Sequence, residues 1–586
     1  MRVLFLTHSF NSLTQRLYIE LVERGHEVSI EFDINDAVTI DAVRLFRPDL
    51  IVAPYLRRPI PEEIWRRHLC LVVHPGIVGD RGPSALDWAI LNGEREWGVT
   101  VLQATGEMDA GPVWASLAFP MREIRKSSLY RNEVTEAAVA AVLQAVEKYL
   151  SGGPRPKTED GRRVDARGQW HPLMNQADRR IDWSTDDTRT VLRKIHSADG
   201  FPGVEDELFG EIYHLYDACE DDDLRGAPGA IIARRHGAIC RATRDGAVWI
   251  GQLKKIIPGE KTFKLPATRV LNGRLHDVPE VPLPRHLTAN RRTYQEIWYE
   301  EKNAVGYLHF DFYNGAMSSG QCRRLQEAYI EARARPTRVI VLMGGADFWS
   351  NGIHLNVIEA ADSPADESWR NINAMDDLAQ AIITTDTHLT ISALQGSAGA
   401  GGVFLALAAD RVCAREGVVL NPHYKNMGNL YGSEYWTYLL PKRLGAERGR
   451  KIMGNRLPLG AAAARRIGLI DDCFGENSGA FVTQVGSIAE ALAQDPGFEL
   501  RLDAKRRQRA RDESTKPLVA YREEELEQLK LNFYGFDPSY HVARYNFVFK
   551  ISHSWTPLHL ARHRRRTKDA YSDNPALSAT ESASTI

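Results

Sequence analysis

The chain has 586 residues, of which 43% are hydrophobic and 26% are charged, and its formal net charge is −2. This length exceeds what a single hydrophobic core fills, so two to four domains are expected. The balanced charge excludes a global field that would recruit nucleic acid or an anionic membrane surface. The six cysteines are scattered without a C-x-x-C pair, which argues against a zinc site or disulfide framework and suits a reducing cytoplasm.

The N-terminal stretch MRVLFLTHSF is a short apolar run that soon turns polar, so a first strand is expected in place of a signal peptide. No uncharged apolar segment reaches membrane-spanning length. Strand and helix patterns then alternate through residues 1–150, which predicts an α/β fold with a parallel, Rossmann-like sheet. No G-x-G-x-x-G follows the first strand, so a dinucleotide is not favoured as its ligand.

His74 leaves the end of a predicted buried strand and opens the run HPGIVGDRGPSALDWAILNGEREWGVTVLQATGEMDAGPV, residues 74–113. This run strongly resembles the formyltetrahydrofolate-dependent transferases and hydrolases. The resemblance implies that His74 and Asp109 are catalytic and that 10-formyltetrahydrofolate is the formyl donor. A histidine can stabilise the oxyanion formed at a formamide, and a carboxylate can take the proton of the nucleophile.

One position departs from the family motif, because Val72 stands where its catalytic asparagine is expected. Either another group takes that role, or the acceptor differs from an ordinary amine. The resemblance also implies that folate lies against a set of loop residues: Tyr55, Leu56, Arg57, Arg58 and Gly106. For the two arginines, a solvated charged pair is an equally good interpretation.

Residues 151–178 are rich in Gly, Pro and charge, which predicts a linker. Residues 179–275 change from one helix to short strands and resemble the small OB-like C-terminal domain of methionyl-tRNA formyltransferases. In those enzymes this domain helps to hold tRNA, but the acidic run 220–223 and the even charge argue against RNA binding here. Residues 276–290 are expected to be a connector.

Two Gly-rich segments each follow an apolar, β-branched run in the C-terminal half: GGADFWSNGIHL at 344–355 and QGSAGAGG at 395–402. A strand that turns into a helix through glycines presents free N–H groups, and two such turns can form an oxyanion hole. Either segment alone would indicate only a tight turn; together they indicate a site for a carbonyl oxygen.

These segments resemble the enoyl-CoA hydratase/isomerase (crotonase) superfamily, which implies coenzyme A as a ligand and a ββα spiral fold. Carried over by motif, the oxyanion amides are those of Ile353 and Gly401. The CoA-binding residues that the resemblance implies are Ser350, His354, Leu355 and Gly402. The two glutamates of hydratases fall at Phe404 and Tyr424, so hydration is not expected, and Tyr424 with Glu434 is left to handle protons.

The crotonase-like part is assigned to residues 291–564, including C-terminal helices, and residues 565–586 are predicted to be disordered. A formyl-folate part joined to an acyl-CoA part resembles a family of [NiFe]-hydrogenase maturation factors. That resemblance implies formyl transfer to coenzyme A and release of carbon monoxide, the CO ligand of the hydrogenase iron, with maturation proteins as candidate partners that accept it. The alternatives are a formyltransferase or hydrolase with a CoA-binding module, and a non-catalytic scaffold that delivers a one-carbon unit. No metal ligand set is predicted.

Overall fold

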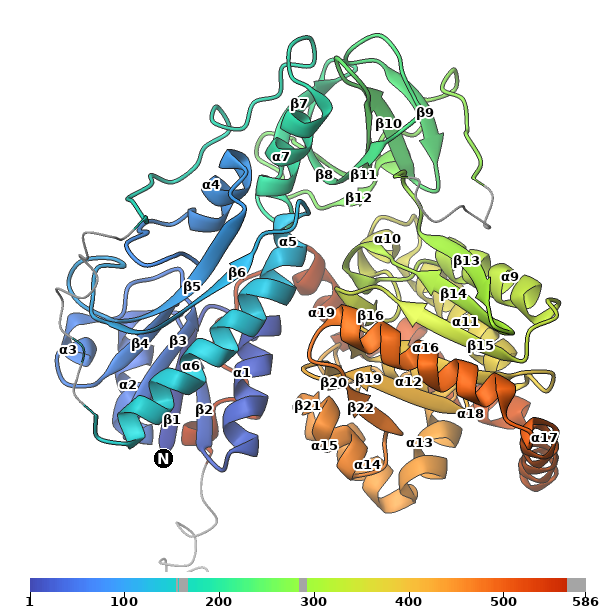
Figure 1. Cartoon of the computed structure of the whole chain (residues 1–586). Coiled ribbons are helices and arrows are strands. Elements are labelled where there is room, and N and C mark those ends of the chain that lie inside the picture. The colour runs from blue at the N-terminus through green and yellow to red at the C-terminus, as the bar shows by residue number, and fades with distance from the viewer. Residues whose placement is uncertain (154–155, 157–166, 284–291, 566–586) are drawn as a thin grey trace, which may run out of the picture.

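The computed structural model describes residues 1–153, 156, 167–283 and 292–565, and within them the chain forms three sheet-based parts (Figure 1). The small β part lies at the top of the view, between the N-terminal part on the left and the C-terminal part on the right. The tail for which disorder is predicted lies, apart from its first residue, outside the described residues. No helix within the described ranges is both long and apolar enough to cross a membrane.

The N-terminal part is one six-stranded sheet in the order β2-β1-β3-β4-β5-β6. Its strands are β1 (Arg2–Thr7), β2 (Glu27–Phe32), β3 (Leu50–Tyr55), β4 (Cys70–His74), β5 (Glu96–Gln103) and β6 (Val113–Pro120). Its helices are α1 (Ser12–Glu23), α2 (Asp36–Phe46), α3 (Glu62–Trp65), α4 (Ala85–Asn92), α5 (Lys126–Leu129) and α6 (Thr135–Leu150). Helices α1 and α6 pack in the core on one face of the sheet, and α2 packs in the core on the other.

The predicted parallel pairing holds from β1 to β4 and fails beyond it, because β5 pairs antiparallel with both β4 and β6. The loop from β5 to β6 contains no helix, and a short connection of this kind joins antiparallel strands. His74 is the last residue of β4 and therefore lies where the parallel part of the sheet ends.

The second part is an antiparallel sheet in the order β7-β8-β11-β10-β9, with β12 paired to β11. Its elements are α7 (Thr188–Ala198), β7 (Val204–Leu208), β8 (Glu211–Asp221), β9 (Ile231–Arg235), β10 (Ala238–Ala242), β11 (Ala247–Lys255), β12 (Leu265–Pro266) and α8 (Ala267–Val270). Within the expected linker before it, Trp88 of α4 stacks on His171 and Met174 is buried. The end of that segment therefore packs against the N-terminal part.

The C-terminal part contains two sheets. The larger has the order β13-β14-β15-β17-β19-β22, with strands β13 (Ile297–Lys302), β14 (Val305–Phe310), β15 (Val339–Gly344), β17 (Leu389–Leu394), β19 (Arg411–Arg415) and β22 (Asp472–Phe474). The smaller has the order β16-β18-β20-β21, with strands β16 (Phe348–Ser350), β18 (Ser397–Gly399), β20 (Val419–Asn421) and β21 (Leu459–Gly460). Each Gly-rich segment thus passes through a short second strand before its helix begins.

Helices surround these two sheets, and α16 lies across the larger one (Figure 1). They are α9 (Ser319–Arg333), α10 (Leu355–Glu359), α11 (Pro364–Ile383), α12 (Gly401–Leu407), α13 (Trp436–Leu444), α14 (Ala446–Asn455), α15 (Ala461–Arg466), α16 (Ser478–Gln494), α17 (Phe498–Thr515), α18 (Leu518–Tyr534) and α19 (Ser539–Val548). Phe404 of α12 is fully buried in the main core.

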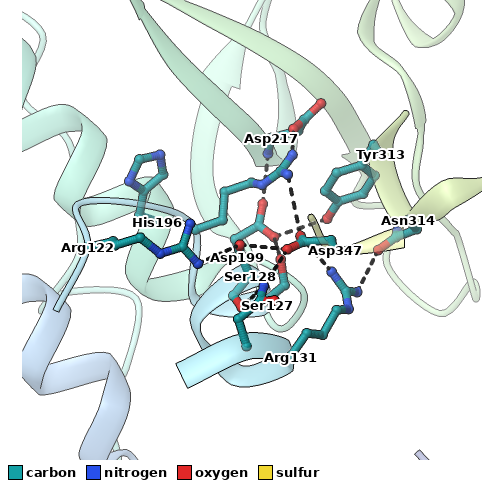
Figure 2. Close-up of polar contacts among 12 residues, drawn as sticks. Arg122, Ser127, Ser128, Arg131, His196, Asp199, Asp217, Tyr313, Asn314 and Asp347 are labelled. Atoms are coloured by element: carbon teal, nitrogen blue, oxygen red, sulfur yellow. Dashed lines mark hydrogen bonds and ion pairs between the residues drawn. The ribbon is translucent and has the colours of Figure 1, made fainter. Parts of the chain in front are cut away.

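The three parts meet at a buried polar cluster (Figure 2). Arg125, which precedes α5, pairs with Asp217 of the small β part and lies 3.6 Å from Asp347 of the C-terminal part. Ser128 donates to Asp347 at 2.6 Å, and Ser127 donates to Asp199 at 2.7 Å. Because each part supplies charged or hydroxyl groups to the same cluster, the cluster fixes the parts relative to one another.

The chain finally returns to the N-terminal sheet. The segment that follows α19 lies along the edge strand β2, where the Leu560 carbonyl accepts from the Ile30 amide at 3.1 Å. The Thr556 hydroxyl accepts from the Phe32 amide at 2.9 Å, and His563 contacts the buried carboxylate of Glu31 at 2.9 Å. The last described residues therefore cover one edge of the first sheet.

Candidate active sites

The first site lies at the end of β4, where the side chain of His74 is buried between two carboxylates. Its Nε2 atom lies 2.8 Å from Asp80, and its Nδ1 atom lies 3.6 Å from Asp109. With the Nε2–H donating to Asp80, Nδ1 is the ring nitrogen that faces Asp109. The structure therefore brings together the predicted pair and adds a carboxylate that the sequence reasoning missed.

The loops around His74 have little freedom. A side chain at Gly76 would occupy the space of the hydrogen bond between His74 and Asp80, so only glycine fits there. Asp109 adopts a left-handed backbone conformation with φ of 54°, and its carboxylate accepts from the Gly82 amide at 3.2 Å. A small cavity beside the pair is lined by both aspartates. Both carboxylates are thus fixed at the edge of a small space that has room for about one water molecule.

Val72 lies in β4 itself, paired with Ala53 and Leu102 in the neighbouring strands. An apolar side chain therefore lies on the same strand as His74, two residues before it. No polar group from position 72 reaches the histidine.

The residues expected to contact folate follow β3 and precede Asp109. Arg58 forms an ion pair with Asp36 at 2.8 Å, and the Arg57 amide donates to Asp33 at 3.1 Å. The guanidinium of Arg57 lies 6.0 Å from the ring centre of Tyr55. Leu56 packs against the core of the sheet and Gly106 is exposed in its loop. Of the two arginines, Arg57 is the one whose side chain lies beside an aromatic ring.

The second site forms where the two Gly-rich turns meet. A Cβ atom built on Gly352 would lie 3.4 Å from the Gly401 amide nitrogen, so the two turns are in direct contact. Among the described residues, the amides of Ile353 and Gly401 donate to no other part of the chain. Gly401 is the first residue of α12, where an N–H has no partner within the helix. This geometry matches the predicted pair of free donors.

Glu434 lies directly over this pair of turns. Its Oε1 atom is next to the Cα of Gly401, since a side chain at that glycine would overlap the carboxyl group. Its Oε2 atom accepts from the hydroxyl of Tyr424, whose ring stacks on Phe404 at 5.5 Å between ring centres. The structure therefore brings together the predicted donors, the phenol and the carboxyl group.

The charge state of Glu434 follows from its surroundings. Burial, and after it the neighbouring charge of Asp376, raises the pKa of its carboxyl group to about 8. Burial and the contact with Glu434 also raise the pKa of Tyr424 above its ordinary value. At neutral pH both groups therefore carry protons, and Oε1 is the carboxyl oxygen nearer to Gly401.

The remaining residues expected to bind CoA have structural contacts. The Ser350 hydroxyl is buried and accepts from the Gly352 amide at 3.1 Å. His354 caps α10 through Nδ1, and burial lowers the pKa of its ring to about 4, so it is neutral. Leu355 begins α10, and the Gly402 carbonyl accepts from the Trp349 indole at 2.9 Å. These contacts help to fix the backbone of the two turns.

Sequence reasoning missed three buried carboxyl groups, Asp80, Asp376 and Glu525. A signal for the last two exists, because each lies on the apolar stripe of its helix. Asp376 is four residues from Ile372, and Glu525 is four residues from Leu529. A charged residue on such a stripe has to be paired or protonated when the helix packs.

Comparison with known proteins agrees with this division of the chain. The family model "Formyl transferase" matches residues 21–146, "Formyl transferase, C-terminal domain" matches residues 173–267, and "Enoyl-CoA hydratase/isomerase" matches residues 300–533. The methionyl-tRNA formyltransferase of Thermotoga neapolitana is 27% identical over 41% of this chain and 75% of its own length.

Two proteins are similar over nearly the whole chain. The hydrogenase maturation factor HoxX of Bradyrhizobium diazoefficiens is 56% identical, over 97% of this chain and 98% of its own. The crystal structure of HypX from Aquifex aeolicus in complex with tetrahydrofolic acid superposes with a TM-score of 0.93 and 50% identity, covering 97% of this chain and 99% of that one.

Proposed function

Because this chain belongs to the HoxX/HypX family of hydrogenase maturation factors, we propose that it makes carbon monoxide from a folate-bound formyl group. The N-terminal site transfers the formyl group of 10-formyltetrahydrofolate to the thiol of coenzyme A. The C-terminal site then converts formyl-CoA into carbon monoxide and free coenzyme A. The product supplies the CO ligand of the [NiFe]-hydrogenase iron, and maturation proteins that accept it are the expected partners.

One observation carries this proposal: the chain holds two separate proton-handling centres, and the second lacks what hydration needs. Glu434 is the carboxyl group next to Gly401, and the tyrosine that bonds it, Tyr424, stacks on the apolar ring of Phe404. A hydratase needs a second acid–base group to activate water. A single protonated carboxyl group next to an oxyanion hole suits a reaction without water.

At the first site, the CoA sulfur attacks the formyl carbon and the carbonyl oxygen becomes an oxyanion. His74 stabilises that oxyanion, while Asp109 takes the thiol proton and passes it to the folate nitrogen as the carbon–nitrogen bond breaks. Asp80 holds the imidazole in place from its other nitrogen. A thiol ionises more readily than an amine, which is consistent with Val72 at the position of the family asparagine.

At the second site, the amides of Ile353 and Gly401 hold the carbonyl oxygen of formyl-CoA. Glu434 gives its proton to the sulfur as the carbon–sulfur bond breaks, and that electron pair leaves with the sulfur. The same carboxylate then takes the formyl proton, and the carbon–hydrogen electron pair becomes the lone pair on the carbon of CO. Glu434 ends protonated, as it began, and Tyr424 steadies its charge in between through the hydrogen bond to Oε2.

The test uses pure protein with 10-formyltetrahydrofolate and coenzyme A, with carbon monoxide trapped on haemoglobin. The proposal expects CO in proportion to the tetrahydrofolate formed, and none when coenzyme A is omitted. Formyl-CoA that accumulates without CO would instead indicate a formyltransferase with a CoA-binding module. Binding of both ligands without turnover would indicate a delivery scaffold, and either result would overturn the proposal.

A further inference from the structure

The loop that carries Glu434, residues 433–437, is held by two buried carboxylates that the proposed reaction does not use. Asp376 comes from α11, and its Oδ1 atom accepts from the Glu434 amide at 2.8 Å. Glu525 comes from α18, and its Oε2 atom accepts from the Tyr435 amide at 3.0 Å. Both side chains are fully buried, so neither carboxylate is stabilised by bulk water.

The backbone of this loop needs such support. Glu434 and Tyr435 adopt left-handed conformations in succession, with φ of 58° and 59°. Residues with a Cβ atom rarely adopt this conformation, and two in a row are rarer still. The Thr437 amide donates to Glu525 at 2.8 Å, and its hydroxyl donates to the same oxygen. The carboxylates of Asp376 and Glu525 therefore hold the backbone on both sides of the conformation that aims Glu434.

The donors around the three carboxyl groups decide where the negative charge lies. Glu525 accepts from two amides and the Thr437 hydroxyl, which is the pattern of an ionised carboxylate. Asp376 accepts from the Glu434 amide and lies 3.6 Å from the Arg522 guanidinium. Among the described residues, the Oε1 atom of Glu434 accepts no hydrogen bond. The proton of the cluster thus belongs on the oxygen that faces the two amides.

We propose that Asp376 and Glu525 are positioning residues of the second site, which hold the 433–437 loop and keep the Glu434 carboxyl group protonated over the oxyanion hole. The inference rests on the proposed decarbonylation, because only a proton donor at this position needs the arrangement. Two charges on neighbouring helices repel a third on Glu434. Burial raises the pKa of Asp376 and of Glu525 as well, but the charge of Arg522 lowers that of Asp376 and the hydrogen bonds from Thr437 lower that of Glu525, so these two hold negative charge more readily than Glu434.

The other groups that face Glu434 do not supply this effect. Tyr424 donates a hydrogen bond to Glu434 and stays neutral. The thiol of Cys322 is also neutral, because burial raises its pKa. Arg522 lies on the far side of Asp376 and also pairs with Asp377 at 2.7 Å. The positive charge of Arg522 therefore offsets the negative charge of the two aspartates more than that of Glu434.

The test is the pH dependence of CO release from supplied formyl-CoA. In the unmodified protein kcat/KM is constant at neutral pH and falls as the pH rises through the pKa of Glu434, because the proton donor is lost. Asp376→Asn and Glu525→Gln each remove one negative charge, so ionised Glu434 becomes less unfavourable. The alkaline limb of each variant should move to lower pH by about one unit.

The chain offers matched controls one residue away. Asp377→Asn and Glu524→Gln make the same chemical changes at exposed carboxylates on the same helices. Their alkaline limbs should stay within a few tenths of a pH unit of the unmodified protein. Two independent variants on different helices guard against misfolding of either one, and circular dichroism with thermal unfolding checks both.

The outcomes separate this inference from the function on which it rests. If the unmodified protein releases no CO from formyl-CoA, the proposed function is wrong. If it does, but Asp376→Asn and Glu525→Gln lower the rate without moving the limb, the two residues are structural only and the inference is overturned. An equal shift in the control variants would also overturn it, because the effect would then be one of net charge.

Discussion

The two sites use carboxylates in opposite ways. At the first, Asp80 and Asp109 flank the two ring nitrogens of His74, so the carboxylates orient an imidazole. At the second, Asp376 and Glu525 surround another carboxyl group, so the same charge keeps Glu434 neutral. The first site lies on loops at the end of a sheet, beside a cavity, whereas the second is enclosed by helices. The group next to a buried carboxylate, an imidazole at the first site and a carboxyl group at the second, therefore determines the effect of its negative charge.

The largest expected effect comes from Glu434→Gln. It removes the carboxyl proton donor beside the oxyanion hole, and general acid–base groups contribute about 10²–10⁴-fold to rate. CO release from formyl-CoA should fall by that factor, while formyl transfer to coenzyme A continues. Formyl-CoA should then accumulate, measured by chromatography of the quenched reaction. Unchanged CO release would show that Glu434 is not the proton donor of the second site.

His74→Ala should have the opposite effect on the two reactions. Loss of the oxyanion-stabilising imidazole should reduce formation of formyl-CoA from 10-formyltetrahydrofolate by about 10²–10³-fold. CO release from supplied formyl-CoA should remain at the unmodified rate, because Glu434 and the two amides are untouched. If both reactions fail together in a folded protein, the two sites do not work independently.

Asp80→Asn tests the carboxylate that orients His74, and a smaller effect is expected. In a Ser-His-Asp triad, replacing the carboxylate that orients the histidine costs about 10⁴ in kcat. Here Asp109 still faces the other ring nitrogen, so we expect a loss of about 10-fold to 10²-fold in formyl transfer. CO release from supplied formyl-CoA should stay at the unmodified rate. A variant that transfers formyl groups at the full rate would show that Asp80 does not orient His74.

The smallest expected signal is hydration of crotonyl-CoA, which should be undetectable by loss of absorbance of the conjugated thioester. The motif comparison predicts Phe404 and Tyr424 at the places of the two hydratase glutamates, and their rings stack on each other. Neither the buried ring nor the neutral phenol activates water. Robust hydration would mean that Glu434 serves a different reaction.

Sequence reasoning predicted the parts of the fold that have strong local patterns. The buried strands β15 and β17 follow from the apolar, β-branched runs that precede the two Gly-rich segments. The second small sheet was not predicted, because β16, β18, β20 and β21 have two or three residues each and show no period. The antiparallel pairing of β5 with β6 follows from the short connection between them, which the sequence analysis did not use.

The candidate site residues also divide into those with a local pattern in the sequence and those without one. The formyltransferase motif predicted His74 and Asp109, and Glu434 was predicted as a carboxylate close to Tyr424 in the sequence, so each of these predictions used a local pattern. Asp376 and Glu525 lie 58 and 91 residues from Glu434 along the chain, by subtraction of their numbers, so no local pattern connects them. Only the packing of α11 and α18 against the loop shows what these carboxylates do.

The segment that covers β2 has a consequence for how the protein is made. Strand β2 is an edge of the first sheet, and exposed edges invite pairing with other chains. Its cover, which includes Thr556 and Leu560, leaves the ribosome more than 500 residues after the strand does. At roughly 5–20 residues per second, the bare edge persists for tens of seconds of synthesis. A nascent chain truncated before α19 should therefore be the form most prone to aggregate and to engage chaperones.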